Sequence, residues 1–290
     1  MHRIPSLALN LLPLAIRPAL ATARGLGARA VTFTADWVGG FERPGVIPVA
    51  ELEGRTLQDF RRAVRHADLT VAALDLPDLL TGGEGLDRIY ALGARGIELL
   101  AALDGPTGVL SVEVGAAAAA AVHPSAGGDA AAAATVRSAL HELVGFGLNR
   151  GVRVAVRSSG PWVASLGPGG AAGPAGLSAP GALDGLTVDL DLPQARRFGA
   201  RLAPLIEASR GRIVHLRCDD QDLRLRPAAR QGLWLPQRVE KPEPESLDEL
   251  TIFLEHAGYE GAWTLAATPP APAGATGLQA LAAALERLRI

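Results

Sequence analysis

Short apolar runs alternate along this chain with longer stretches that carry a helical period. Several runs are almost continuously apolar, which is typical of parallel strands covered on both faces. Strands and helices that alternate with about 36 residues per unit predict an α/β fold and, over residues 1–290, a single (β/α)8 barrel domain. The runs expected as its eight strands are residues 6–10, 30–34, 69–75, 109–114, 152–156, 186–190, 213–216 and 262–265.

The stretches between these runs place their apolar residues on one helical face. Leu57, Phe60 and Val64 recur at helical spacing, as do the leucines of the last stretch. Residues 96–100 could form a strand, but the apolar face that begins at Leu86 continues through Ile97, so we expect one long helix. Segments at about 39–54 and 158–183 are rich in Gly, Pro or Ala and are expected as long loops. For the second, an ordered lid and a flexible tether are equal alternatives.

The charge balance argues against a nucleic-acid partner. The 290-residue chain has a formal net charge of −2 and a pI near 6.3, whereas nucleic-acid binding needs a dense basic stripe. The basic run 224–230 follows three aspartates and is expected as a solvated loop, with a phosphate site as the alternative. Cys218 is the only cysteine, which excludes an intrachain disulfide and a cysteine-rich zinc site.

The apolar runs are too short for a membrane span, which needs roughly 18–20 uninterrupted residues. Residues 1–23 loosely resemble a secretory signal. However, Asn10, Pro13 and Arg17 interrupt the apolar region, and a first strand and helix explain the segment better. We therefore expect a cytoplasmic protein with no membrane partner, either a monomer or a homodimer.

Polar side chains end most of the expected strands. In a parallel barrel these ends meet at one mouth, where barrel enzymes carry their chemistry. Carboxylates with an imidazole can hold a hard divalent ion or supply a general acid and base. Alternatively, the histidine is a satisfied core residue and the aspartates of strand six cap backbone groups. The residues expected at the mouth are Asn10, Asp36, Asp75, Glu113, Arg157, Asp189, Asp191, His215, Arg217 and Asp219.

Four short motifs resemble one family of barrels. They are LTVD at 186–189, IVHLR at 213–217, GYEG at 258–261 and, more weakly, GARAV at 27–31. On these motifs the chain resembles, over essentially its whole length, the xylose-isomerase-like barrels. These include sugar phosphate isomerases/epimerases, hydroxypyruvate isomerases and the endonuclease IV group. The resemblance implies a xylose-isomerase-like TIM barrel.

The resemblance also implies a degenerate metal site. Members of that family bind Mg²⁺ or Mn²⁺ through a glutamate ending strand five, an aspartate on strand six, a histidine on strand seven and a glutamate ending strand eight. Asp189 and His215 match the middle two positions, but Arg157 and Ala266 stand where the glutamates would be. Because a guanidinium is always charged, it repels a metal ion, and we expect no metal cofactor. Arg157 should instead pair with Asp189 or with a carboxylate or phosphate of a ligand.

Three hypotheses about function follow. The first is a sugar or sugar-phosphate isomerase/epimerase-like protein whose metal-dependent activity is lost or altered. The second is a non-catalytic barrel that binds a small anionic or sugar ligand or a protein partner. The third is a metal-independent enzyme that uses His215 and an aspartate as acid and base. The candidate catalytic residues are His215 and Asp189, and the candidate substrate-binding residues are Arg157, Arg217, Asp75, Glu113, Asp36 and Asn10.

Overall fold

The computed structural model describes the strands and most of the helical stretches of the chain. The described residues are 3–12, 14–36, 41, 45–76, 86–103, 108–113, 130–157, 185–197, 201–219, 222–224, 244, 246–267 and 275–289. The segment expected as a loop at 158–183 lies outside them, as does the basic run after residue 224.

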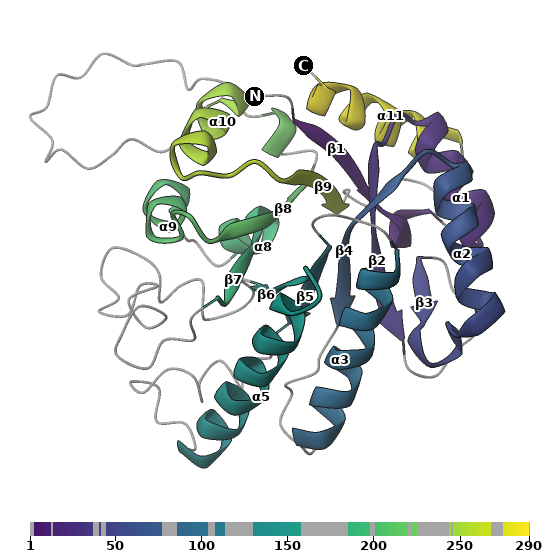
Figure 1. The fold of residues 1–290 in the computed structure, drawn as a ribbon. Coiled ribbons are helices and arrows are strands. Elements are labelled where there is room, and N and C mark those ends of the chain that lie inside the picture. Colours follow the sequence, from purple (N-terminus) through teal and green to yellow (C-terminus); the bar gives the residue numbers. More distant parts are fainter. Residues whose placement is uncertain are drawn as a thin grey trace, which may run out of the picture.

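Eight parallel strands close into a barrel, as the sequence predicts (Figure 1). Closure occurs at β1, where Ser6 lies opposite Ala30 of β2 on one side and opposite Thr264 of β9 on the other. The barrel strands are β1 (Ile4–Ala8), β2 (Ala30–Asp36), β4 (Thr70–Leu76), β5 (Val109–Glu113), β6 (Arg153–Arg157), β7 (Thr187–Asp191), β8 (Ile213–Asp219) and β9 (Ala262–Ala267).

A ninth, short strand continues the sheet beside β2. β3 (Val46–Pro48) pairs with the last residues of β2, beyond the point where β1 ends at Ala8. The expectation of a long loop at about 39–54 was therefore wrong over β3, the following 3-10 helix η2 (Val49–Glu51) and the start of α2. Gly45 precedes β3 with φ +68°, and a Cβ added there would lie 2.1 Å from the backbone nitrogen of Asn10, so only glycine fits.

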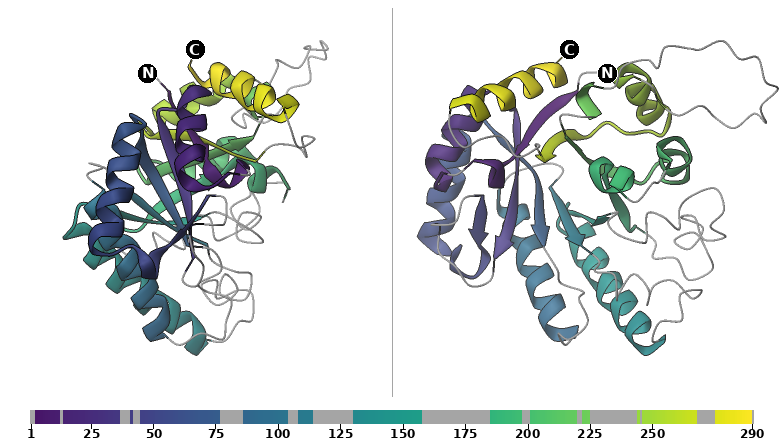
Figure 2. Two further views of the ribbon diagram at one scale, coloured as in Figure 1. Left: turned by 90° about the vertical axis from the view of Figure 1, so that its right-hand side faces the viewer. Right: turned by 180° about the vertical axis from the view of Figure 1, so that it is seen from behind.

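Helices cover the outside of the barrel (Figures 1 and 2). α2 buries Phe60 and Val64, and α11 buries Leu281 and Leu285, as the helical period indicates. Residues 96–100 lie within α3, so the helix expected there is confirmed. No helix in the described part of the chain is long and apolar enough to cross a bilayer. The helices are α1 (Ile16–Gly25), α2 (Gly54–His66), α3 (Leu86–Ala102), α5 (Ala130–Leu148), α8 (Leu192–Arg197), α9 (Leu202–Ala208), α10 (Leu247–His256) and α11 (Ala275–Arg289), with the 3-10 turns η1 (Leu9–Leu11) and η4 (Asp222–Arg224).

The barrel has an apolar wall and a partly polar interior. Alternate strand residues such as Leu7, Phe33 and Leu74 belong to the buried apolar core between the strands and helices. Other strand positions, in the middle of the barrel, carry polar side chains that are almost completely buried. These are Ser6, Thr32, Ser111, Asp189, His215 and Thr264. Polar groups at this depth need partners within the barrel, because an unsatisfied buried polar group is costly.

Candidate functional site

A cavity of about 220 Å³ lies at the carboxyl end of the strands. In parallel barrels this is the end that carries ligand sites. Its lining combines two arginines with two aspartates and uncharged polar side chains, so it offers hydrogen-bond donors and acceptors side by side. The lining residues are Asn10, Thr34, Asp75, Arg157, Asp191, Pro193, Gln194, Arg217 and Ala266. We call this hollow the mouth cavity.

Arg217 of β8 lines the mouth cavity and joins two carboxylates, one in the cavity lining (Asp75) and one below it (Asp189). Its Nε donates to Asp189 Oδ2 at 2.8 Å and its Nη1 donates to Asp75 Oδ2 at 2.9 Å, while Nη2 donates to the other oxygen of Asp75. Burial alone would lower the pKa of Arg217, but the carboxylates of Asp189 and Asp75 outweigh it and raise the pKa above its ordinary value. Arg217 is therefore a permanent cation in a two-oxygen fork, the geometry that guanidinium favours.

Arg157 of β6 lies beside the same carboxylates, and its side chain is only 13% exposed. Its Nη1 donates to Glu113 Oε2 at 3.2 Å, its Nη2 lies 3.2 Å from Asp75 Oδ1, and its Nε lies 3.7 Å from Asp189 Oδ2. The anionic partner expected for Arg157 is thus present in the protein itself. Its Nε and Nη2 are nevertheless buried and make no hydrogen bond to any residue that the structure describes.

Asp189 and His215 lie one layer deeper in the barrel. Asp189 Oδ1 is 2.8 Å from His215 Nδ1, and Ser111 donates to Asp189 Oδ2. Burial alone would raise the pKa of Asp189, but Arg217, His215 and Arg157 outweigh it and hold the pKa well below its ordinary value. Because an ionised carboxylate only accepts hydrogen bonds, the proton of this pair belongs on Nδ1 of His215.

His215 continues this hydrogen-bonded chain away from Asp189. Its Nε2 lies 2.7 Å from Thr264 Oγ1, which is 3.2 Å from Thr32 Oγ1. Both ring nitrogens of His215 are thus engaged in hydrogen bonds within the barrel. The side chains of His215 and Asp189 are 1% and 0% exposed, and neither lines the mouth cavity. The structure therefore places the two candidate catalytic residues in contact with each other but beneath the arginines.

The candidate substrate-binding residues fall into two groups. Asn10, Asp75, Arg157 and Arg217 line the mouth cavity, with Asn10 in η1 because β1 runs over Ile4–Ala8, two residues earlier than expected. Glu113 lies behind them and contacts Arg157. Asp36 ends β2 opposite Pro48 of β3, and it is not among the described lining residues.

Thr34 and Gln194 also line the mouth cavity, although neither was expected there. Thr34 is two residues after the buried Thr32, so the alternation of β2 could have identified it. Gln194 lies in the first turn of α8, directly after Asp191, whose Oδ1 accepts the backbone N–H of Gln194 at 2.9 Å. The capping interpretation of Asp191 is thus confirmed. Burial raises the pKa of Asp191, and the Gln194 N–H and Arg217 oppose this only in part.

A second charged cluster lies beside the mouth, at the end of β8. Arg196 of α8 contacts Asp219 at 2.8 Å and Asp222 at 2.5 Å, and the two aspartates accept each other's backbone N–H groups. Burial, opposed in part by Arg196, raises the pKa of Asp222 to about 8. Burial also raises the pKa of the Cys218 thiol. Asp219, expected at the mouth, belongs to this cluster instead.

Comparison with known proteins identifies the fold. No family model matches the sequence, and no curated protein matches it either. A xylose isomerase domain protein from Alicyclobacillus acidocaldarius superposes with a TM-score of 0.67 at 19% identity, over 98% of this chain and 96% of the other. The fold is that of the xylose-isomerase-like barrels.

Two further solved structures match over nearly their whole length. The 3-keto-D-glucoside 4-epimerase from E. coli has a TM-score of 0.65 at 14% identity, over 99% of both chains. AP endonuclease, family 2 from Brucella melitensis has a TM-score of 0.63 at 16% identity, over 97% of both chains. At these identities the likeness shows the fold. In this xylose-isomerase-like barrel, no three His, Cys, Asp or Glu side chains among the described residues are arranged to hold a metal ion.

Proposed function

We propose that this protein binds a small sugar in the mouth cavity and is an isomerase/epimerase-like barrel whose metal-dependent chemistry is lost or altered. The observation that carries the proposal is the position of Arg157 and Arg217. Their guanidinium groups lie among Asp75 and Asp189, at the level where the resemblance would place a metal ion.

The residues present do not fit Mg²⁺ or Mn²⁺. Asp189, the one matching carboxylate, already accepts from Arg217 at 2.8 Å and from His215 at 2.8 Å. A divalent ion at this carboxylate would lie within a few ångströms of two guanidinium groups. Each unit charge at about 4 Å contributes roughly 4 kcal/mol of repulsion at an effective dielectric of 20, and the ion carries two charges. Arg157 and Ala266 also supply no anionic oxygen in exchange.

The cavity suits an uncharged polyhydroxyl ligand. Its volume of about 220 Å³ lies below the roughly 300–1,000 Å³ of sites for drug-sized molecules, so its occupant is of monosaccharide size. The hydroxyls of such a ligand can accept from the arginines and donate to Asp75 and Asp191. The two arginines are already paired with surrounding carboxylates, which favours an uncharged ligand over a phosphate with close to two negative charges. The printed name of the E. coli epimerase, which acts on a keto-glucoside, supports a sugar as the ligand class.

A small carboxylate is the second candidate ligand. It is favoured by the Nε and Nη2 of Arg157, which are buried and make no hydrogen bond to the described residues. Acid/base catalysis by His215 and Asp189 receives less support, because both lie beneath the arginines and the Nε2 of His215 is engaged by Thr264. In this proposal they are positioning residues that hold Arg217, and Asp75 and Asp191 are the acidic groups that reach the ligand.

The experiment is a calorimetric and thermal-shift screen over neutral sugars, sugar phosphates and hydroxy acids, without added metal. We expect a neutral sugar to bind and Arg157→Ala to weaken its binding by about 2–3 kcal/mol, since charge-assisted hydrogen bonds are lost. Arg157→Lys should recover only part of this. Arg153→Ala, on the same strand but at its opposite end, is the matched control and should bind normally. If no compound binds, or if Arg157→Ala binds as tightly as the wild type, the proposal fails.

A further inference from the structure

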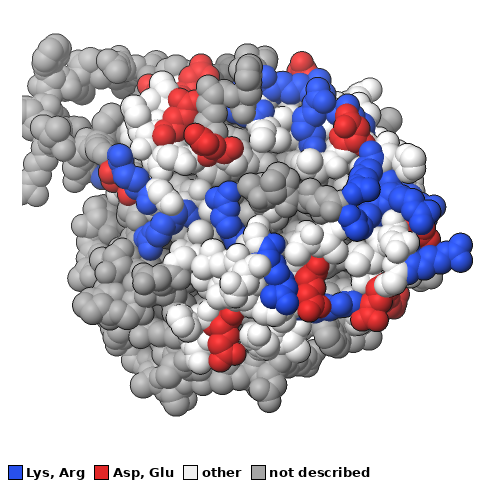
Figure 3. Space-filling model, viewed as in Figure 1, with Lys and Arg blue, Asp and Glu red and all other residues white. Residues whose placement is uncertain are grey.

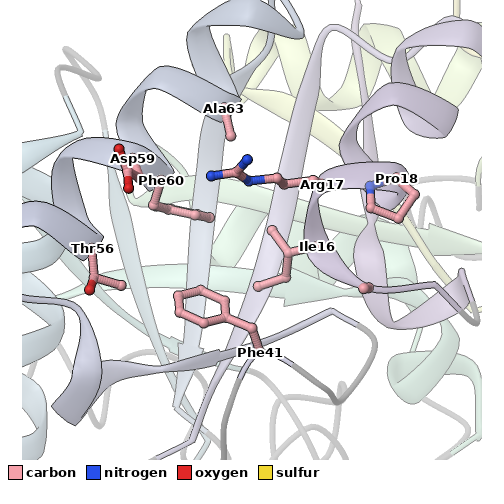
Figure 4. A pocket seen from close by; sticks show the side chains of 9 residues that line it. Ile16, Arg17, Pro18, Phe41, Thr56, Asp59, Phe60 and Ala63 are labelled. Atoms are coloured by element: carbon pink, nitrogen blue, oxygen red, sulfur yellow. The ribbon is translucent and has the colours of Figure 1, made fainter.

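A groove runs between α1 and α2 on the outside of the barrel, and none of its described lining residues lines the mouth cavity. It consists of two hollows of about 410 and 500 Å³ that share Arg17, Asp59 and Ala63. Ile16 and Phe60 form an apolar floor, and Figure 4 shows the Arg17 side chain reaching across from α1 toward α2 above it. We call this feature the α1–α2 groove. An apolar floor bordered by charged residues is typical of a surface that binds another protein.

The borders of the groove are basic. Arg17, Arg62 and His66 line it, and Asp59, the one acidic residue among its described lining, lies 3.5 Å from Arg62 and is matched by it. Arg17 forms no ion pair with any residue of the described chain. Figure 3 shows arginines gathered over the side of the molecule where Figure 1 places α1 and α2. The occupant should therefore present an apolar side chain between acidic ones.

The exposed face of α10 has that composition. Ile252 is 49% exposed at its centre, and Asp248 and Glu255 lie four residues before and three residues after it, on the same helical face. Glu249 is also exposed on this helix. Figure 3 shows acidic side chains gathered where Figure 1 places α10. Asp248 also contacts Arg3 of the same chain at 3.1 Å, but its side chain is 90% exposed and such surface pairs are weak, so it can still face a cation of another copy. The acidic face of α10 thus opposes the basic borders of the α1–α2 groove around an apolar centre.

We propose that the α1–α2 groove receives the exposed face of α10 from a second copy of this chain. Ile252 enters the apolar floor, while the acidic residues beside it face Arg17 and Arg62. α10 and the groove lie on different sides of the barrel (Figure 1). The contact is therefore head-to-tail: each copy offers both a donor helix and an acceptor groove, and assembly closes into a ring or continues as an open chain.

The first test measures mass against concentration for the full chain by sedimentation velocity and light scattering. We expect the wild type to grow beyond a monomer as concentration rises, and salt to oppose this because the contact is charge-assisted. Ile252→Ser, which removes the apolar anchor, and Ala63→Arg, which fills the groove, should each raise the dissociation constant at least about tenfold. Leu148→Ser is the matched control, because Leu148 is 59% exposed on α5 and should leave association unchanged.

Mixing two variants tests the head-to-tail geometry. Alone, Ile252→Ser keeps an intact groove and Ala63→Arg keeps an intact donor helix, and each should remain a monomer. Together they can form one contact only, so a 1:1 complex should appear and grow no further. The proposal is overturned if the wild type stays monomeric at every concentration, or if both variants associate as tightly as the wild type. Circular dichroism checks that each variant is folded. Sugar binding is a second check, because none of the changed residues lines the mouth cavity.

Discussion

Arg217 and Asp189 are joined by a 2.8 Å hydrogen bond from Nε to Oδ2, with both side chains buried. This contact uses an oxygen of the carboxylate that the resemblance assigns to a metal ion. Asp75 accepts the two remaining arms of the same guanidinium. The cation at the centre of this barrel is therefore the Arg217 guanidinium, which is part of the polypeptide. Removing this guanidinium should lower the free energy of unfolding.

Replacing Arg217 with Met should lower the free energy of unfolding by about 3–5 kcal/mol, because two buried carboxylates lose their common partner. Arg217→Lys should be intermediate, since a point charge cannot serve Asp189 and Asp75 in a fork. Urea unfolding followed by circular dichroism measures both. Arg210→Met, which removes an exposed pair with Glu207 at 3.0 Å, is the control and should cost about 1 kcal/mol or less. Equal losses for the two arginines would refute the prediction.

Asp189 should make the protein sensitive to acid. Its pKa in the folded chain lies well below the ordinary value of 3.8, because Arg217, His215 and Arg157 overcome the effect of burial. The folded state thus binds the proton less tightly than the unfolded state does. The stability that this group contributes is present above about pH 4 and is lost as the pH falls through the folded pKa. Melting temperatures measured from pH 7 to pH 2 should fall less steeply for Asp189→Asn than for the wild type. Parallel curves would contradict this assignment.

Asp222 should have the opposite effect. Its pKa is raised by burial to about 8 from 3.8, so the folded state holds the proton more tightly. Its contribution is fully present below about pH 4 and is lost as the pH rises toward 8, at no more than about 1.4 kcal/mol per pH unit. Asp222→Asn cannot lose a proton and should remove this slope from urea unfolding measured between pH 5 and 8. Asp68→Asn, at an exposed pair with Arg24, is the control and should keep the slope.

Elemental analysis of protein purified without chelator should find no stoichiometric Mg²⁺, Mn²⁺ or Zn²⁺. The double change Arg157→Glu with Ala266→Glu removes one positive charge and adds two carboxylates at the mouth. It should therefore create measurable divalent binding by calorimetry. The single change Ala266→Glu, which keeps both arginines, is the control and should bind much more weakly. A wild type that carries close to one ion per chain and loses it in His215→Ala would refute this prediction.

The eight strands could be predicted because each is a distinct apolar run. β3 could not, since three residues are too few for an alternating pattern to stand out from a loop. The position of Asp189 and His215 on neighbouring strands was also within reach of the sequence and is confirmed, since they lie opposite each other on β7 and β8. Their expected place in the lining of the mouth was wrong, because both lie beneath it.

The depth of these residues in the barrel was harder to predict. Arg217 comes two residues after His215, and residues two apart on a strand point the same way but lie one layer apart. A mouth defined only as the last few residues of each strand merges these layers. Under this definition, the buried Asp189 and His215 were expected beside the two arginines, although only the arginines line the cavity. The ion pairs themselves depend on side-chain directions across five strands, β4 to β8, which no local pattern contains.

The arginine network also restricts how this barrel can change by single substitutions. Replacing either Arg157 or Arg217 alone leaves buried carboxylates facing one another, and adding a glutamate at position 266 alone brings a carboxylate to a site whose cations are already matched. Each one-step route back toward a metal site thus passes through a less stable protein. Lineages that carry this network should therefore keep it as a block or exchange several of its members together. A lone substitution at one of these positions should be rare among relatives that still fold.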